Sequence, residues 1–229
     1  MKIALTTVRP RRCLTVWGQV LLLSIAGVSA YFLFSNLYDF LAPDLPPHRG
    51  VMVIEGWIHD DALEAAANRF RTGDYSRIVC TGVPFETGSC LLPFRSYPEM
   101  TAQRLYRLGL PSNRVSVAVA PLAQRDRTYL AALALRRSLE KNPAVDRQLE
   151  LVTTGPHARR SLRLFRTALG NDFRIGVVAL PDAGYPPERW YAYSEGVRKV
   201  VGETIAYAYA LLLFRPDPAA DLRTIEKTP

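Results

Sequence analysis

The sequence is poor in the residues that build disulfides and zinc sites. Its 229 residues include 3 cysteines and 3 histidines, and they contain no CxxC pair or cysteine–histidine spacing typical of zinc. The sequence therefore argues against a structural zinc site. A disulfide between Cys80 and Cys90 is compatible with an oxidising compartment, but the apolar, strand-like surroundings of Cys80 favour a free core cysteine.

Charged side chains are missing from one long stretch near the N-terminus. Residues 13–37 contain none, and residues 16–34 are apolar and long enough to cross a bilayer as a helix. The basic residues before this stretch are Lys2, Arg9, Arg11 and Arg12. Because the basic flank of a span stays in the cytoplasm, the sequence predicts a cytoplasmic N-terminus over residues 1–12 and a transmembrane anchor over residues 13–37. We expect a single-pass protein of the cytoplasmic (inner) membrane with a periplasmic, extracytoplasmic domain.

A cleaved leader is the alternative to an uncleaved anchor. Residues 28–30, Val-Ser-Ala, resemble a small-residue cleavage site, and the pair Arg11-Arg12 before an apolar run is similar to a twin-arginine signal. The apolar run continues beyond this site to Phe34, which favours the anchor.

The positive charge of the chain is concentrated at its start. Of the formal net charge of +8, four charges precede the anchor, so the exported part is only mildly basic. This charge is compatible with anionic lipid headgroups or phosphates as partners. An exported domain of this kind is not expected to bind nucleic acid. Protein partners and cofactors do not follow from the sequence.

Beyond the anchor, the pattern predicts a spacer and then one domain. Residues 38–49 are rich in proline and are predicted to form a stalk that lifts the domain off the membrane. Short apolar runs typical of buried strands cover residues 51–54, 77–82, 115–119, 149–152 and 175–180. Helical patterns cover residues 60–70, 98–108, 127–140, 157–169 and 194–214.

Alternation of strands and helices at this spacing predicts a Rossmann-like, three-layer α/β/α domain with a parallel sheet of about five strands. It covers residues 50–215, and a tail follows over residues 216–229. The last helix contains a strongly apolar run, residues 205–214. This run is too short for a second span, so we expect a buried helix that packs on the sheet.

Polar side chains follow four of the predicted strands, where parallel sheets bind ligands. The candidate site residues at these strand ends are Glu55, Gly56, Thr81, Gly82, Arg127, Thr128, Thr154, Gly155 and His157. Trp57 is predicted either to line the pocket or to pack in the core.

The stretch Val152 to Ser161 carries the most specific pattern. Gly155 permits a tight turn into a helix, whose N-terminus would hold an anion such as a phosphate together with Arg160. His157 is the candidate proton donor or base, with Glu55 or Glu99 as its partner. These three side chains are also possible metal ligands, although their spacing alone does not predict a metal.

The motifs IEGW, CTG, SYPEM, DRTYLAAL, VTTGPHARRSLRLF and GETIAYAYALL occur in this order. Together they resemble the DUF218 family of bacterial envelope proteins, the group of YdcF, SanA and ElyC, and most closely a membrane-anchored branch with EGW and HARRS motifs. The likeness covers residues 50–214. It implies a Rossmann-like fold and a role in cell-envelope biogenesis, with links to peptidoglycan precursors and lipid carriers.

The resemblance also implies functional positions. The residues that match the family's motifs are Thr81, Gly82, Glu99, Thr128, His157, Arg160 and, more weakly, Glu203. The chain departs from the family where Glu55-Gly56-Trp57 replaces a double glycine and Gly155 replaces an acidic residue. These losses leave a shared chemistry in doubt.

Three functions remain open. The first is a hydrolase or transferase that acts on a phosphorylated or anionic envelope precursor. The second is a non-catalytic module that binds or senses an envelope component with the same cleft. The third is a purely structural scaffold, which would need neither His157 nor Arg160.

Overall fold

The computed structural model describes residues 13–87, 91–141, 146–216 and 221. The chain forms two compact units, residues 1–37 and residues 38–229. The predicted cytoplasmic segment, Cys90 and nearly all of the predicted tail lie outside the described residues. A disulfide between Cys80 and Cys90 is therefore not tested, because Cys90 is outside the described residues. Cys80 itself is fully buried, as expected for a core cysteine.

The first unit contains helix α1 (Val16–Ser35), which matches the predicted anchor. Thr15 caps it, because the Thr15 hydroxyl accepts a hydrogen bond from the Gly18 N–H at 3.2 Å. None of its side chains is buried. Within the part of the chain that the structure describes, α1 is the one helix long and apolar enough to cross a membrane.

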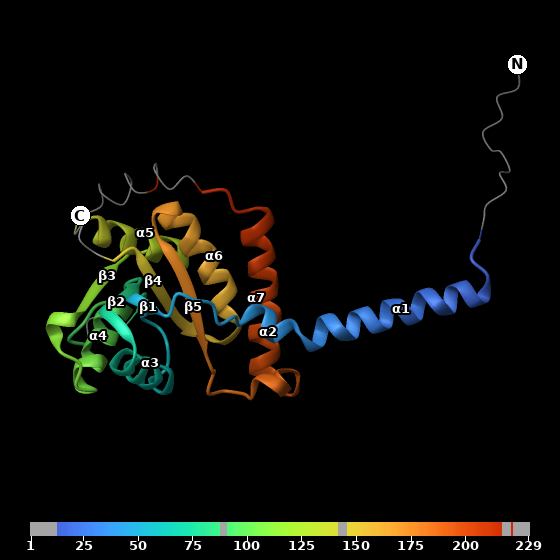
Figure 1. Cartoon of the computed structure of the whole chain (residues 1–229), viewed down its shortest axis with the longest axis horizontal. Coiled ribbons are helices and arrows are strands. Elements are labelled where there is room, and N and C mark those ends of the chain that lie inside the picture. The colour runs from blue at the N-terminus through green and yellow to red at the C-terminus, as the bar shows by residue number, and fades with distance from the viewer. Residues whose placement is uncertain (1–12, 88–90, 142–145, 217–220, 222–229) are drawn as a thin grey trace, which may run out of the picture. The chain divides into compact units, whose positions relative to one another are not determined.

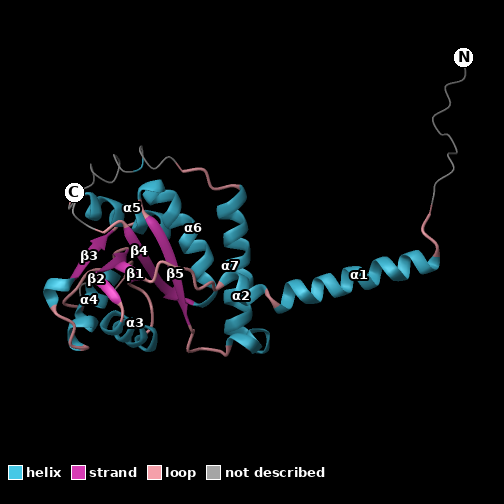
Figure 2. Cartoon of the chain, in the orientation of Figure 1, coloured by secondary structure: helices cyan, strands magenta, loops and turns pink. Residues whose placement is uncertain are grey.

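The second unit is built on a five-stranded, all-parallel sheet, as Figure 2 shows. The strands are β1 (Arg49–Glu55), β2 (Asp74–Gly82), β3 (Val115–Val119), β4 (Gln148–Thr154) and β5 (Arg174–Leu180). Their spatial order is β3-β2-β1-β4-β5. The central strands are buried on both faces, which explains why they are continuous apolar runs in the sequence.

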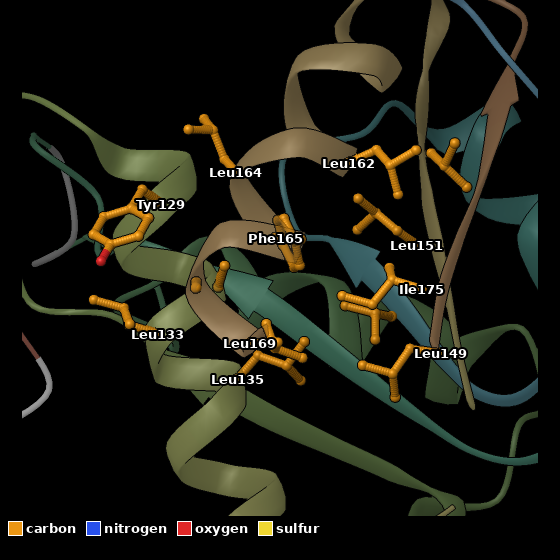
Figure 3. Packing of buried hydrophobic residues seen from close by; sticks show 14 of the residues in the cluster. Tyr129, Leu133, Leu135, Leu149, Leu151, Leu162, Leu164, Phe165, Leu169 and Ile175 are labelled. Carbon is orange, nitrogen blue, oxygen red and sulfur yellow. The ribbon is translucent and has the colours of Figure 1, made fainter. Parts of the chain in front are cut away.

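Two pairs of helices cover the sheet (Figure 1). Helices α3 (Asp60–Thr72) and α4 (Tyr97–Arg107) share one hydrophobic cluster with one face of the sheet. Helices α5 (Arg127–Glu140) and α6 (Ala158–Leu169) share a second cluster with the other face. Phe165 of α6 lies between the leucines of α5 and β4 in Figure 3. The predicted three-layer α/β fold is confirmed.

The last helix differs from the prediction. Helix α7 (Ser194–Leu212) packs mainly on the 3₁₀ segment Pro187–Ala192, on α6 and on the turn Gly155–His157. Its buried residues are only Gly196, Val200 and Ala210. Because α5 and α6 already cover this face of the sheet, α7 lies at the flank of α6 and stays largely exposed. The prediction of a buried helix is therefore wrong.

The predicted stalk belongs to the domain. Tyr38 and Leu41 of the short helix α2 (Leu37–Leu41) are buried. Leu45 exchanges two backbone hydrogen bonds with Val177, of 2.8 and 2.9 Å, and thereby covers the open edge of β5. Gly176 permits this approach, since a Cβ atom there would lie 2.3 Å from the Leu45 carbonyl oxygen. Residues 38–49 are therefore a covering segment of the domain rather than a free spacer.

Candidate functional site

A pocket of about 590 Å³ opens at the carboxyl edge of the sheet. It lies beside the ends of β1 and β4, where the strand order changes direction and where sheets of this type bind ligands. Its volume is in the range of small-molecule sites. The predicted site residues that line it are Glu55, Thr81, Gly82, Arg127, Thr128, Thr154, His157, Arg160 and Glu203.

Three predicted site residues do not line the pocket. Glu99 lies in the first turn of α4, where its carboxylate accepts a hydrogen bond from the Arg95 N–H at 2.7 Å. Gly56 bonds through its backbone to Thr81 and Thr101. Gly155 forms the turn behind the pocket. The proposed pairing of Glu99 with His157 is therefore not supported, and Glu99 has a local structural role.

Helix α6 brings His157 into the pocket through a single 3₁₀ turn, Gly155–His157. Gly155 adopts a φ of +48°, the left-handed region that favours glycine. A Cβ atom at this position would lie 3.2 Å from the Tyr38 hydroxyl. The turn therefore needs glycine for both its backbone and its close packing, as the sequence predicted for the backbone.

His157 lies between two carboxylates. Its Nδ1 is 2.7 Å from Glu203 Oε1, and its Nε2 is 3.5 Å from Glu55 Oε1. Arg160 Nη2 is also 2.9 Å from Nδ1. One nitrogen cannot donate and accept at the same time, and the shorter contact with a carboxylate identifies Nδ1–H as a donor to Glu203. Glu203 thus fixes the orientation of the imidazole.

The contacts of His157 with the two carboxylates shift the pKa values of His157 and Glu203. Burial opposes the charged imidazole, but the charge of Glu55 and the hydrogen bond to Glu203 outweigh it and raise the pKa of His157 to about 9. Burial also opposes the charged form of Glu203, but hydrogen bonds from His157 and Arg160 lower its pKa to about 2. At neutral pH the site therefore holds an imidazolium between carboxylates.

Glu55 is the most deeply buried acid of the site. It ends β1 with 3% of its surface exposed. Burial alone would raise its pKa, but the charge and hydrogen bond of His157 outweigh this effect and lower it. The Ser161 hydroxyl donates to its two oxygens at 3.2 and 3.1 Å. Trp57 packs against the imidazole with an edge-to-face ring distance of 4.9 Å and lines the pocket.

Arg160 divides its donors between the protein and the pocket. Its Nε donates to Glu203 Oε2 at 2.7 Å, and its Nη2 lies 3.1 Å from Glu203 Oε1. Among the described residues, no acceptor binds Nη1. Arg127 lies at the rim, half exposed, and pairs with Glu86 at 2.6 Å. Both arginines are therefore placed to meet an anion, but neither is an uncompensated charge.

A second polar group on the pocket wall was not predicted. Lys199 of α7 donates to the buried Asp182 at 2.5 Å. Asp182 also raises the pKa of Tyr38, together with the larger effect of burial, to about 12. Lys199 precedes Glu203 by four residues, so the helical period places both on the pocket side of α7. The spacing of four residues between Lys199 and Glu203 is therefore the feature of the sequence that could have predicted Lys199 as a pocket residue.

The structure does not assemble the proposed metal ligands. Glu55 and His157 are neighbours, but Glu99 lies outside the pocket. Over residues 13–87, 91–141 and 146–216, no group of three histidine, cysteine, aspartate or glutamate side chains is arranged to hold a metal ion.

Comparisons with family models, curated proteins and solved structures find no match to this chain. The resemblance to the DUF218 family therefore stays a prediction that rests on the motifs, and the function is argued from the pocket.

Proposed function

We propose that the protein is a membrane-anchored hydrolase or transferase that acts on a phosphorylated or otherwise anionic precursor of the cell envelope. The observation that carries this proposal is the His157 imidazole, which Glu203 orients and Glu55 adjoins on the wall of a ligand-sized pocket. The envelope context comes from the resemblance to the DUF218 family and from the anchor.

The chemistry assigned to the residues is general acid–base catalysis. Water or an acceptor substrate attacks the phosphorus of the ligand as the bond to the leaving oxygen breaks. With Nδ1–H held by Glu203, the Nε2–H of His157 donates its proton to that leaving oxygen. The resulting neutral imidazole accepts the proton that the attacking water or acceptor loses, and the Glu55 carboxylate stabilises the imidazolium that re-forms. Arg160 and Arg127, with Lys199, stabilise the negative charge of the ligand.

The location belongs to the same proposal. Helix α1 is long and apolar enough to cross a membrane, and the basic residues before it favour a cytoplasmic N-terminus. The pocket then lies on the extracytoplasmic side of the cytoplasmic membrane, where lipid-linked envelope precursors are exposed.

A non-catalytic binding module is the second candidate. The observation that favours it is the pairing of His157 and Arg160 with carboxylates of the protein. A polar ligand could bind there by replacing Glu203 as the partner of His157 or Arg160, and such binding requires no chemical reaction.

The two candidates differ in a phosphate-release assay. We would incubate the full-length protein in nanodiscs with a polyprenyl pyrophosphate, with and without divalent cations, and measure both binding and release of phosphate. The enzyme predicts release, and His157→Gln should reduce the rate by about 100- to 10,000-fold while binding persists, because a general acid or base contributes about this factor. Arg127→Ala should weaken binding by about 10-fold or more, because a hydrogen bond to a charged group is lost.

Arg166→Ala is the matched control, because Arg166 lies on the same helix as Arg160 but outside the pocket and donates a hydrogen bond to the Ile175 carbonyl. It should bind and react like the wild type. Binding without release in the wild type would support the binding module. Neither binding nor release, or equal behaviour of all three variants, would contradict both candidates.

A further inference from the structure

Helix α7 has two faces of different character. The face toward α6 contributes Lys199, Glu203 and Ala206 to the pocket. The opposite face carries an apolar stripe at helical spacing, which we call the outer face: Val197, Val201, Ile205, Ala208 and Leu212. On this face Ile205 is 66% exposed and Leu212 63% exposed. A soluble surface rarely keeps such a stripe uncovered, so the outer face indicates a contact.

If α1 crosses a membrane, the short connection from α1 to the domain brings the bilayer close to α7. Helix α1 ends at Ser35 and the domain begins at Tyr38, and three residues span at most about 10 Å. Phe40, two residues further on, packs edge-on against Tyr207 of α7 with ring centroids 5.8 Å apart. If α1 crosses the membrane, the start of the domain and the adjoining α7 are held close to the membrane surface.

The side chains on and next to α7 suit lipid headgroups. Arg159 lies over the Phe40 ring, 4.0 Å from its centroid. Arg198 lies on α7 beside the stripe, with 76% of its side chain exposed, and pairs with Glu195 one turn earlier. Half-exposed Phe40 adds an aromatic side chain next to Arg159 and Tyr207. An apolar helical face with aromatic and basic neighbours is typical of helices that lie in the interface of a membrane with anionic lipids.

We propose that the outer face of α7 lies on the surface of the membrane that α1 crosses, with its stripe among the upper acyl chains. The proposal rests on the membrane anchor but not on catalysis. One helix then separates the pocket from the bilayer. The ligand class that this position favours is a phosphorylated headgroup still attached to its lipid.

The test is a depth measurement on the full-length protein in liposomes of phosphatidylethanolamine and phosphatidylglycerol. A nitroxide is attached to Ile205→Cys in a Cys13→Ser, Cys90→Ser background, since Cys80 is fully buried. Oxygen partitions into the bilayer and a nickel chelate stays in water. We expect the label at position 205 to collide with oxygen and to be protected from nickel.

Glu64→Cys is the matched control, because Glu64 is exposed on α3, which packs on the other face of the sheet. Its label should show the reverse preference, for nickel. Adding Val201→Asp to the position-205 variant should remove the protection from nickel without unfolding the protein, because Val201 is exposed. Circular dichroism verifies the fold.

Two results would overturn the proposal. Nickel access at position 205 equal to that at position 64 means that the outer face lies in water. Spin–spin broadening between labels at position 205 that disappears on dilution into unlabelled protein means that a second copy covers the face instead. Neither result depends on turnover, so the proposed enzyme can fail or stand independently.

Discussion

At the residue scale, the structure contains the same histidine–glutamate–arginine geometry twice. His48 Nδ1 lies 2.7 Å from Glu150 Oε2, and Arg69 Nε donates to Glu150 Oε1 at 2.7 Å, as in the group around Glu203. Glu150 is near the start of β4, at the amino edge of the sheet, where the Tyr75 hydroxyl also binds it at 2.6 Å. It does not line the pocket. A histidine–glutamate–arginine group of this geometry is therefore a way to bury a carboxylate. The group around Glu203 has a candidate chemical role because it lies on the pocket wall.

The raised pKa of His157 makes the stability of the protein depend on pH. A histidine with a raised folded pKa contributes stability fully below its ordinary value of 6.5, and this contribution is lost as the pH rises through about 9. Glu203 has a pKa lowered to about 2, so it contributes stability fully above its ordinary pKa of 4.5. This stability is lost as the pH falls through about 2. We expect the free energy of unfolding contributed by the pair to be largest between pH 4.5 and 6.5, measured by urea denaturation.

Glu203→Gln is the control for this prediction. It removes the charge that stabilises the imidazolium but keeps a similar shape, so the pKa of His157 should fall by at least about one unit. The loss of stability between pH 6.5 and 9 should shrink accordingly. NMR titration of the imidazole nitrogens reads the pKa directly. A wild-type His157 that titrates near 6.5 would contradict the assigned geometry.

At the element scale, the turn between β4 and α6 decides where His157 lies. Gly155→Ala should destabilise the protein by about 1–2 kcal/mol, because a residue with a Cβ atom is strained in the left-handed region. The added methyl also lies 3.2 Å from the Tyr38 hydroxyl. Urea denaturation measures the loss of stability. The His157 pKa should move as well, because the turn carries the imidazole.

Gly202→Ala is the matched control for this turn. Gly202 lies inside α7, and a Cβ atom there meets nothing within 4 Å. Alanine in a helix interior should stabilise the protein by about 0.5–1 kcal/mol. Similar changes of stability in both variants would mean that the Gly155 turn carries no special backbone constraint.

The elements themselves were predictable from local patterns. A strand that is buried on both faces must be apolar along its length, so β1 and β4 were recognisable as apolar runs in the sequence. The predicted strand over residues 115–119 has the same first and last residues as β3. The packing of α7 was not predictable, because an apolar run does not say which surface is left for it to cover. The position of residues 38–49 was missed for a similar reason, since the bonds between Leu45 and Val177 join segments distant in sequence.

The position of the site was predictable from the sequence, but the hydrogen-bond and ion-pair partners of its residues were not. Strand ends converge at one edge of a parallel sheet, and this rule correctly grouped Glu55, Thr81 and His157. It failed for Glu99, whose side chain turns back to its own helix start. Ser161 and Asp182 were missed, because their bonds to Glu55 and Lys199 depend on how α6 and α7 face the sheet.

At the scale of the whole molecule, the proposed location of the pocket depends on helix α1 and on the side of the membrane to which it directs the domain. The described part of the chain contains one helix long and apolar enough to cross a membrane, and a single crossing would put the described residues after it on one side. The four basic residues before it favour a cytoplasmic N-terminus. The buried Cys80 is compatible with either side, because burial raises the pKa of its thiol and suppresses its reactivity.

The topology is testable with reporters fused after Pro229. Alkaline phosphatase needs export to become active, whereas green fluorescent protein of the ordinary type fluoresces only when folded in the cytoplasm. We expect an active phosphatase fusion and a dark fluorescent fusion. Because the bias of lysine and arginine orients a single span, replacing Lys2, Arg9, Arg11 and Arg12 by glutamine should lower the phosphatase activity and raise the fluorescence. A bright fluorescent fusion of the unaltered chain would place the pocket in the cytoplasm, and the extracytoplasmic substrate would then be excluded even if the pocket itself is catalytic.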